Sequence, residues 1–454
     1  MGTVDRARLG ALMERERATF EERHPRSKEL WERARGSLLS GVPMNWMTRW
    51  PGAYPVFVRE AHGARFTDVD GNEFVDLCLG DTGAMTGHSP EISADAIADQ
   101  ARRGITLMLP TEDSIWVGEE MARRFGLPYW QFALTATDAN RFVLRLARQI
   151  TGRPKVLVYN WCYHGSVDET VATIRDDGSV GPRVGSVGPQ VDPALTTKVI
   201  EFNDLDALER ALEPGDVACV LAEPALTNVG IVLPEPGYHE ALREITRRTG
   251  TLLVIDETHT ICSGPGGYTR AHKLEPDFLT IGKPLASGVP AAAYGISEET
   301  SQRILGTTYW KEADVGGVGG TLAGNALSLH AMRATLENVL TEKAYGRMIP
   351  LAERFTAGVE SVIEGRQLPW HITRLGCRAE YLFQPERPRN GSEAAARADD
   401  ELDAFMHLYA LNRGILLTPF HNMALMSPAT GEADVDRHTE VYGEAADALV
   451  GART

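Results

Sequence analysis

The chain has 454 residues, of which 43% are hydrophobic and 24% charged, and this composition excludes wholesale disorder, a collagen-like fibre and a coiled coil. Lysine and arginine number 46 against 62 acidic residues, so the net charge is −16 and neither nucleic acid nor an anionic membrane is expected as a partner. No apolar run is long enough to cross a membrane, the first thirty residues lack a signal-peptide core, and the five cysteines form no CxxC pair. We therefore expect a cytoplasmic protein with reduced thiols and no metal site.

The N-terminal part of the chain predicts helices followed by short strands. The first forty residues carry apolar side chains among dense charges, a pattern typical of surface helices. Between residues 56 and 75, short apolar runs are broken by Gly63 and by Asp70-Gly71, which is a hairpin signal. These features predict a small meander of strands that leads into a larger body.

The middle of the chain alternates between predicted strands and helices. Four apolar runs lack the alternation of half-exposed strands and predict strands buried on both faces: 155–159, 218–224, 251–257 and 278–282. The helical stretches between them include 137–150 and 237–248. This order implies an α/β fold with a mostly parallel sheet and with sites at the C-terminal strand ends. After residue 325, helical patterns flank short runs near 371–383 and 414–418, which predicts a separate α+β domain.

Polar side chains stand at the ends of three of these runs. The run 251–257 ends with Asp256 and Glu257, and His259 follows two residues later. Lys283 directly follows the run 278–282, and Glu223 is the next-to-last residue of the run 218–224. The ordinary interpretation of Lys283 alone is a solvated lysine at the end of a strand. The ordinary interpretation of Asp256 alone is a helix cap or a loop carboxylate. Together they suit pyridoxal 5′-phosphate (PLP), because the lysine can form the Schiff base while the aspartate keeps the pyridine nitrogen protonated.

A PLP site also needs a phosphate cradle, which hydroxyl groups and backbone N–H groups at a helix N-terminus can provide. Thr135, Ala136 and Thr137 stand immediately before a predicted helix. An ordinary threonine cap of a helix explains the same residues, so they support a PLP site only in combination with Lys283 and Asp256. In the segment NWCYHG, Tyr163 or Trp161 offers an aromatic ring that could stack on the cofactor.

Several motifs resemble those of the class III aminotransferases of PLP fold type I. In chain order they are DVDGNEFVDL, GHSPEI, TATDAN in place of SGTEAN, RLARQITGRPKV, YHG, EP, DE-x-x-T, TIGK and GGTLAGN. The resemblance is greatest to the β-phenylalanine aminotransferases, with glutamate-1-semialdehyde aminomutase more distant. It implies an α/β fold with a large PLP-binding domain over residues 66–325, containing a mostly parallel sheet. A smaller α+β domain would be formed by both termini, from residues 1–65 and 326–454.

The resemblance implies roles for the residues around the cofactor ring. Lys283 matches the Schiff-base lysine that also moves the proton between Cα and C4′, and Asp256 matches the partner of the pyridine nitrogen. Thr258 matches the residue packed beneath the ring, and Tyr163 matches the stacking aromatic. His164 is counted with the cofactor-binding residues, although a structural role is favoured because Lys283 already supplies the proton transfer.

Further matches concern the phosphate group and a second subunit. Thr135, Ala136 and Thr137 match the phosphate-binding Ser-Gly-Thr, with an alanine methyl group that narrows the approach of the backbone to the phosphate. Thr321 matches the threonine that reaches the phosphate from the partner subunit, so the resemblance implies a homodimer with shared active sites. Glu223 matches the EP glutamate near the O3′ side of the ring.

The residues expected to bind substrate depart from the relatives. In β-phenylalanine aminotransferases an arginine follows the proline of a C-terminal TP turn and binds a carboxylate. Here Phe420 follows that turn and cannot form a charge-assisted pair. Arg49 is the first candidate to replace the arginine and Arg378 the second, although an ion pair would explain either one. Phe420 and Trp46 would make one sub-pocket apolar.

The resemblance implies a PLP-dependent aminotransferase that moves an amino group between an amine or (β-)amino acid, aromatic or apolar, and a keto acid by a ping-pong aldimine mechanism. An aminomutase or an amino-acid epimerase of the same fold shares these residues and stays open. The segment LLVIDETHT also resembles the Walker-B strand of an ATPase or helicase, but Gly282-Lys283 lacks the glycine pattern of a phosphate loop. A non-catalytic relative is disfavoured because both Asp256 and Lys283 are present.

Overall fold

The computed structural model describes four stretches of the chain: 4–188, 191–307, 316–419 and 421–450. By internal contacts the chain divides into two compact units. Unit 1 consists of Met1–Pro90, Lys343–Arg387 and Arg397–Thr454. Unit 2 consists of Glu91–Glu342 and Pro388–Ala396.

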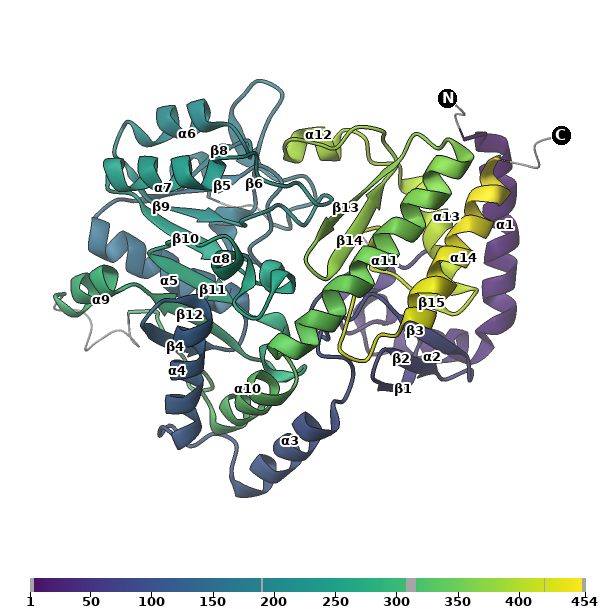
Figure 1. The fold of residues 1–454 in the computed structure, drawn as a ribbon, viewed down its shortest axis with the longest axis horizontal. Coiled ribbons are helices and arrows are strands. Elements are labelled where there is room, and N and C mark those ends of the chain that lie inside the picture. Colours follow the sequence, from purple (N-terminus) through teal and green to yellow (C-terminus); the bar gives the residue numbers. More distant parts are fainter. Residues whose placement is uncertain (1–3, 189–190, 308–315, 420, 451–454) are drawn as a thin grey trace. The chain divides into compact units, whose positions relative to one another are not determined.

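The core of unit 2 is a seven-stranded sheet (Figure 1). In spatial order its strands are β4 (Tyr129–Ala133), β12 (Ala292–Ile296), β11 (Phe278–Ile281), β10 (Leu252–Asp256), β9 (Val217–Ala222), β5 (Lys155–Tyr159) and β8 (Thr197–Ile200). Of these, β12 pairs antiparallel with both of its neighbours, and the other pairings are parallel. Strands β9, β10 and β11 are buried along their whole length, as the apolar runs predicted. The mostly parallel sheet is confirmed.

Helices surround this sheet, and most of them begin and end at residues that satisfy the free backbone groups of a helix end. The helices of unit 2 are α3 (Glu91–Arg103), α4 (Glu112–Phe125), α5 (Ala136–Thr151), α6 (Leu205–Leu212), α7 (Tyr238–Thr249), α8 (Gly267–Ala271), α9 (Glu298–Leu305), α10 (Ala326–Asn338) and α12 (Gly391–Ala395). Helices α5 and α7 match the two predicted helical stretches within one residue at each end. Smaller elements complete the unit: strands β6 (Ala172–Ile174) and β7 (Val180–Pro182) and 3₁₀ turns η3 (Asp168–Thr170), η4 (Pro193–Leu195), η5 (Thr260–Ser263) and η6 (Lys283–Ala286).

Unit 1 contains two small sheets, and the first of them joins the N-terminal and C-terminal parts of the chain. The first has the order β1 (Val58–His62), β2 (Arg65–Asp68), β3 (Glu73–Asp76) and β15 (Ile415–Leu416). The second has the order β13 (His371–Leu375), β14 (Arg378–Leu382) and β16 (Met423–Leu425). Strands β1, β2 and β3 form the predicted meander, with antiparallel pairing throughout. Strand β15 adds to β3 in parallel, so the two ends of the chain share one sheet.

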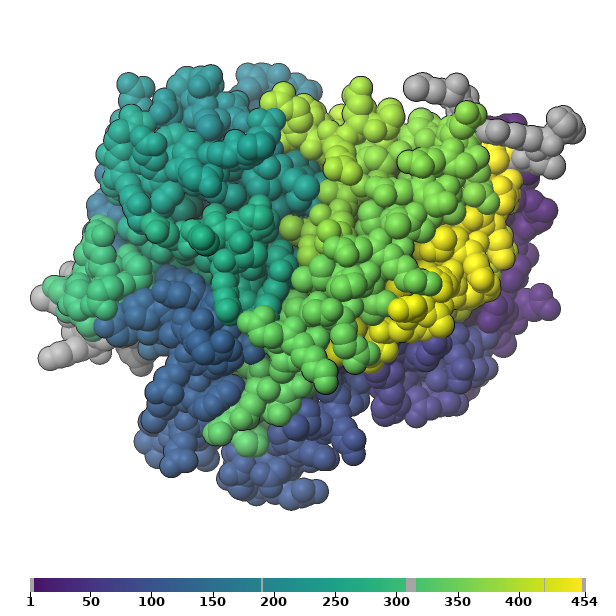
Figure 2. Space-filling view, in the orientation of Figure 1, coloured from purple at the N-terminus to yellow at the C-terminus, as the bar shows by residue number. Residues whose placement is uncertain are grey.

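The helices of unit 1 come from both the N-terminal and the C-terminal parts of the chain. They are α1 (Arg6–Arg23), α2 (Pro25–Ala34), α11 (Glu342–Arg366), α13 (Asp400–Leu411) and α14 (Glu432–Val450), with 3₁₀ turns η1 (Leu39–Gly41) and η2 (Asn45–Thr48). Helices α11 and α14 lie side by side in Figure 1, and their green and yellow surfaces adjoin in Figure 2. Two arginines of α11 hold this pairing: Arg354 and Arg366 bind Asp436 and Asp447 of α14 through 2.7 Å contacts.

The two units divide the chain at residues other than the predicted domain limits of 65 and 325. The first division follows Pro90. Residues after β3 remain with unit 1 because the backbone groups of His88 and Gly63 exchange two hydrogen bonds, of 2.7 and 2.8 Å. The second division follows Glu342, because α10 packs against α3 and η6 of unit 2.

The structure also reports on the predicted absence of membrane segments, disulfides and metals. Among the described helices, none is both long and apolar enough to cross a membrane. All five cysteines are free and buried. Within the described ranges, no group of three or more His, Cys, Asp or Glu side chains is placed to hold a metal ion.

Candidate active site

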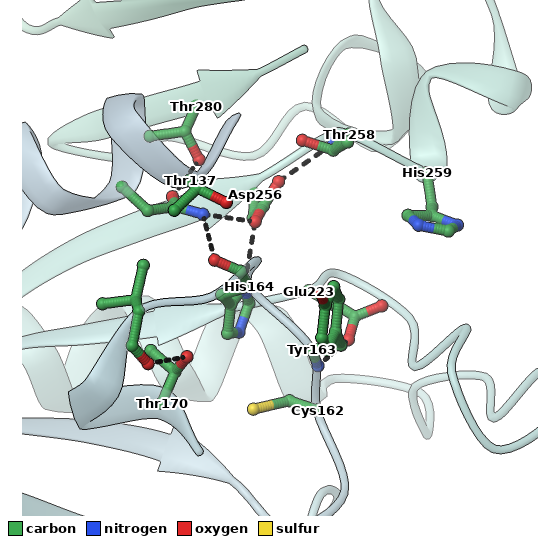
Figure 3. Close-up of polar contacts among 12 residues, drawn as sticks. Thr137, Cys162, Tyr163, His164, Thr170, Glu223, Asp256, Thr258, His259 and Thr280 are labelled. Atoms are coloured by element: carbon green, nitrogen blue, oxygen red, sulfur yellow. Dashed lines mark hydrogen bonds and ion pairs between the residues drawn. The ribbon is translucent and has the colours of Figure 1, made fainter. Parts of the chain in front are cut away.

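The carboxylate of Asp256 is the centre of a buried hydrogen-bond network at the C-terminal end of β10 (Figure 3). Its Oδ2 accepts hydrogen bonds from Nδ2 of Asn140 and Nδ1 of His164, both at 2.9 Å. Its Oδ1 accepts a hydrogen bond from the backbone N–H of Thr258 at 3.1 Å. The three donors come from α5, from the loop after β5 and from the loop after β10, so the network fixes three segments around one charge.

The charges of Asp256 and His164 stabilise each other. Burial alone raises the pKa of Asp256, but the hydrogen bond and positive charge of His164, with the hydrogen bonds of Thr258 and Asn140, bring that pKa down to about 2. Burial lowers the pKa of His164, but its surroundings, including the carboxylate of Asp256, raise it well above 6.5. Asp256 is therefore an anion at neutral pH, in a place where water cannot screen it.

Asn140 ties this pair to the sheet and was not among the site residues predicted from the sequence. Its Nδ2 also donates to the backbone carbonyl of His164 at 3.2 Å, and its Oδ1 accepts from the hydroxyl of Thr280 on β11 at 2.7 Å. Asn140 is the last residue of the TATDAN motif, and that motif is the signal by which the sequence could have identified it. Its contact with Asp256 joins residues 116 positions apart, so the local sequence does not reveal it.

Lys283 lies one position beyond Gly282 at the end of β11 and begins η6. Its backbone has φ = 53°, in the left-handed region that residues other than glycine seldom adopt. Its Nζ is 2.6 Å from Nε2 of His259. His259 was noted in the sequence beside Asp256 but was not chosen as a site residue.

The N-terminus of α5 lies close to both the lysine segment and the YHG segment. Thr135 caps the helix, with its Oγ1 accepting from the backbone N–H of Asp138 at 3.1 Å. A Cβ added to Gly282 would lie 3.1 Å from the backbone N and the Cβ of Ala136, so β11 ends against the start of the helix. A Cβ added to Gly165 would lie 2.0 Å from Oγ1 of Thr137, so the loop after β5 can pass here only because residue 165 is glycine.

Glu223 follows β9 and holds two loops by its buried carboxylate. Its Oε1 accepts from the backbone N–H of Tyr163 at 3.2 Å and from Nδ2 of Asn228 at 3.1 Å. Its Oε2 accepts from the backbone N–H and the hydroxyl of Thr227, at 3.1 and 2.6 Å. In this structure Glu223 therefore positions the backbone of Tyr163, whose side chain is 51% exposed.

Thr258 and Thr321 differ in their surroundings. Thr258 is buried directly after Asp256, where its backbone N–H binds the carboxylate. Thr321 is exposed and borders an open pocket of about 650 Å³. Other residues that line this pocket are Leu107, Met108, Leu109 and Phe132.

The four substrate-binding candidates belong to unit 1, whereas the residues described so far belong to unit 2. Trp46 is part of η2 and is 41% exposed, and Arg49 follows that turn. Arg378 begins β14, is completely buried and pairs with Asp81 at 3.4 Å. Phe420 lies outside the described residues.

The residues of unit 2 fit pyridoxal 5′-phosphate. A carboxylate has about four acceptor positions, and the described donors use three of those of Asp256, so one is left for a protonated pyridine nitrogen. The N-terminus of α5 offers backbone N–H groups and a helix dipole to a phosphate dianion. The amine of Lys283 follows β11, the strand that pairs with β10, at the end of which Asp256 lies. These residues are thus complementary to the pyridine nitrogen, the phosphate group and the aldehyde of PLP.

Comparison with known proteins identifies the family. The model of the class-III aminotransferases matches residues 46–434. The glutamate-1-semialdehyde 2,1-aminomutase of Syntrophomonas wolfei is 32% identical over 433 residues, which cover 93% of this chain and 98% of that protein. A solved glutamate-1-semialdehyde-aminomutase from Pseudomonas aeruginosa PAO1 is 53% identical, with a TM-score of 0.95 over 98% of this chain and 99% of that chain. A variant of the same Pseudomonas protein is solved in complex with PMP, in agreement with the predicted cofactor.

The comparison also reverses the predicted order of the two resemblances. The β-phenylalanine aminotransferase of Variovorax paradoxus has a TM-score of 0.85 over 96% of this chain and 97% of that chain, but only 22% identity, which shows the fold alone. The chain is more similar to the aminomutases named above. The order was misjudged because several of the motifs that carried the prediction contain residues assigned to the cofactor, which related enzymes with different reactions share. The chain belongs to the class-III aminotransferase family and has the PLP-dependent fold of type I.

Proposed function

We propose that this protein is a PLP-dependent aminomutase that moves the amino group of glutamate 1-semialdehyde from C2 to C1, which yields 5-amino-4-oxopentanoate. The observation that carries the amino-group chemistry is the placement of Lys283 and the anionic Asp256 at the ends of adjacent parallel strands. Similarity to the aminomutases of P. aeruginosa and S. wolfei supports a transfer within one molecule. This proposal takes the place of the transfer between an aromatic or apolar amine and a keto acid that the sequence favoured.

Each residue has a distinct task in this proposal. PLP, when bound, supplies a cationic ring that withdraws electrons from the reacting carbon of the substrate. Asp256 keeps the ring nitrogen protonated, because a buried anion favours the charged form of its partner. Lys283 attaches the cofactor and, once released, takes and returns the protons that the transfer requires. Thr135, Ala136 and Thr137 bind the phosphate group through the N-terminus of α5.

The remaining candidates act on the ring face and on the substrate. Tyr163 stacks on the exposed face of the ring, a role supported by its half-exposed side chain and by the fixed position of its backbone. Arg49 binds the substrate carboxylate as a charge-assisted pair. We assign this role to Arg49 in preference to Arg378, since the guanidinium group of Arg378 is completely buried and pairs with Asp81.

The active form in this proposal is a homodimer in the cytoplasm. Leu107, Met108 and Leu109 are 47%, 78% and 73% exposed and border the same pocket as Thr321. A second copy of the chain would bury this apolar segment and bring Thr321 to the phosphate site of the other subunit. The five free, buried cysteines agree with a compartment in which thiols stay reduced.

The test is to count turnovers without an amino acceptor. Full-length enzyme loaded with PLP is mixed with a large excess of glutamate 1-semialdehyde, and the product is followed by chromatography. An aminomutase returns the amino group to the same molecule, so we expect many molecules of 5-amino-4-oxopentanoate per active site with no keto acid present. The Lys283→Ala variant is the matched control and should form none catalytically.

Two other results would contradict the proposal. If each site converts one substrate molecule to 4,5-dioxopentanoate, keeps the amino group on the cofactor and turns over again only when a keto acid is added, the enzyme is an aminotransferase. If an amino acid loses its optical purity while its amino group stays in place, the enzyme is an epimerase. Both results retain the cofactor site and change the reaction performed there.

A further inference from the structure

The amine of Lys283 has a close basic neighbour, the imidazole of His259, with 2.6 Å between Nζ and Nε2. This separation is short for a contact between two nitrogens and requires a proton between them. Two cations cannot share such a distance, because like charges this close raise the free energy of the doubly protonated pair. One of the two nitrogens therefore donates a hydrogen bond to the other.

The sheet register brings the two side chains together. Asp256 of β10 is the register partner of Thr280 of β11, and the strands are parallel. His259 lies three positions after Asp256, and Lys283 lies three positions after Thr280. The two segments therefore leave the sheet at the same level. The backbone N–H of Glu257 donates to the carbonyl of Thr280 at 2.8 Å and keeps the two segments in step beyond the last paired residues.

The acidic groups near this edge have hydrogen-bond partners of their own. Asp256 accepts from His164, Asn140 and Thr258, and Glu223 accepts from Tyr163, Thr227 and Asn228. The carboxylate of Glu257 points to the other side of β10, where it accepts from Thr260 and from the backbone of Tyr268 and Thr269. His259 itself is buried, with 6% of its surface exposed, so its ring is held in place.

We propose that His259 is a positioning residue for Lys283: its Nε2 accepts a hydrogen bond from the ammonium group at Nζ and holds that group whenever the lysine is not bonded to the cofactor. This inference rests on the proposed role of Lys283. The proton on Nζ is the one that the lysine takes from substrate and returns, so a fixed direction of the N–H bond determines which carbon it can reach. His259 forms and breaks no covalent bond.

The test measures the amine itself. Full-length protein saturated with pyridoxamine 5′-phosphate, in which the lysine is not bonded to cofactor, is labelled at neutral pH with a trace of acetic anhydride. Mass spectrometry of the digest gives the acylation rate of Lys283 relative to Lys155 and Lys198, which both pair with Asp216 and serve as internal references. Three variants are compared with the wild type: His259→Leu, His259→Gln and His239→Leu.

Loss of the acceptor destabilises the ammonium form, so a larger share of Lys283 is neutral and reactive. We expect acylation of Lys283 to rise roughly tenfold in His259→Leu and to return close to the wild-type rate in His259→Gln, whose amide oxygen is again an acceptor. His239→Leu should leave the rate unchanged, because the ring of His239 binds the carbonyl of Pro224 instead. An unchanged or lower rate in His259→Leu, or an equal rise in the leucine and glutamine variants, would overturn the proposal. None of these rates depends on which amino-group reaction the enzyme performs.

Discussion

Oδ2 of Asp256 lies 2.9 Å from Nδ1 of His164, and both side chains are buried. The two residues are 92 positions apart in the chain and meet because β5 and β10 belong to one sheet, on either side of β9. Asn140 of α5 binds the same oxygen and locks the arrangement. The negative charge that the cofactor ring requires is therefore preformed by the fold.

The first prediction concerns that charge. Asp256→Asn keeps the shape of the side chain and removes the anion, so the variant should bind PLP but react with substrate about 10²–10³-fold more slowly. Stopped-flow absorbance of the PLP-loaded enzyme measures the rate constant. The control is Glu257→Gln, which changes a neighbouring buried carboxylate that binds Thr260, Tyr268 and Thr269. Near-normal rates for Asp256→Asn would remove Asp256 from its role.

The second prediction concerns stability and pH. The pKa of Asp256 is lowered from 3.8 to about 2, so its contribution is present above pH 3.8 and is lost as the pH falls through 2. The pKa of His164 is raised above 6.5, so its contribution is full below pH 6.5 and is lost as the pH rises through the raised value. Removal of one partner of a buried pair costs about 3–5 kcal/mol. His164→Asn should therefore lower Tm most between pH 3.8 and 6.5, as calorimetry of the cofactor-free protein would show.

The control for this experiment is His239→Asn. Burial lowers the pKa of His239, so His239→Asn should not show a maximum loss of Tm between pH 3.8 and 6.5. If the loss of Tm in His164→Asn is the same at every pH, the ion pair is not what stabilises this part of the fold.

The third prediction places Thr321 in the site of the other subunit. Thr321→Ala removes a hydrogen bond to a charged phosphate and should weaken PLP binding by about ten- to a hundredfold. At a PLP concentration too low to load the Thr321→Ala variant, mixed dimers of Thr321→Ala and Lys283→Ala chains should contain one complete site each and be more active than either variant alone. If Thr321 acts within its own chain, mixing gives no recovery, and a fully active monomer would exclude the shared site altogether.

The fourth prediction distinguishes the two arginines. Arg49→Ala should raise KM for glutamate 1-semialdehyde by roughly ten- to a hundredfold. The single half-reaction of the PLP-loaded enzyme with an amine that lacks a carboxylate, such as 1-phenylethylamine, should be little affected. Arg378→Ala should instead lower Tm, because the ion pair with Asp81 is lost and the interior of unit 1 loses a large side chain. Equal effects of Arg49→Ala on both kinds of substrate would leave Arg378 as the residue to test.

The pattern of the sequence predicted the elements that hold the site. The apolar runs that end at Asp256 and before Lys283 predicted β10 and β11, because strands buried on both faces leave an unmistakable run of branched residues. Their parallel pairing, with Asp256 opposite Thr280, brings the two side chains to one edge of the sheet as expected. Strands β4 and β12 were not predicted, because β4 is partly exposed and contains Gln131, whereas β12 consists largely of alanine and glycine, so neither has a run of branched apolar residues.

The contacts around these residues could not be predicted in the same way. The roles of Asn140 and His164 depend on which strands become neighbours, and a single sequence does not record that order. The pairing of His259 with Lys283 depends on the exact register of β10 and β11, where a shift by one residue would turn either side chain away. The burial of Arg378 depends on its place at the start of β14 in a three-stranded sheet.

The central claim is that the cofactor is attached at the edge where β10 and β11 end. Reduction of the purified, PLP-loaded protein with borohydride, followed by digestion and mass spectrometry, measures the attachment site directly. We predict that the cofactor mass appears on the peptide that carries Lys283, and that Lys283→Ala binds PLP without becoming labelled. Attachment to any other lysine of the wild-type chain would contradict the account.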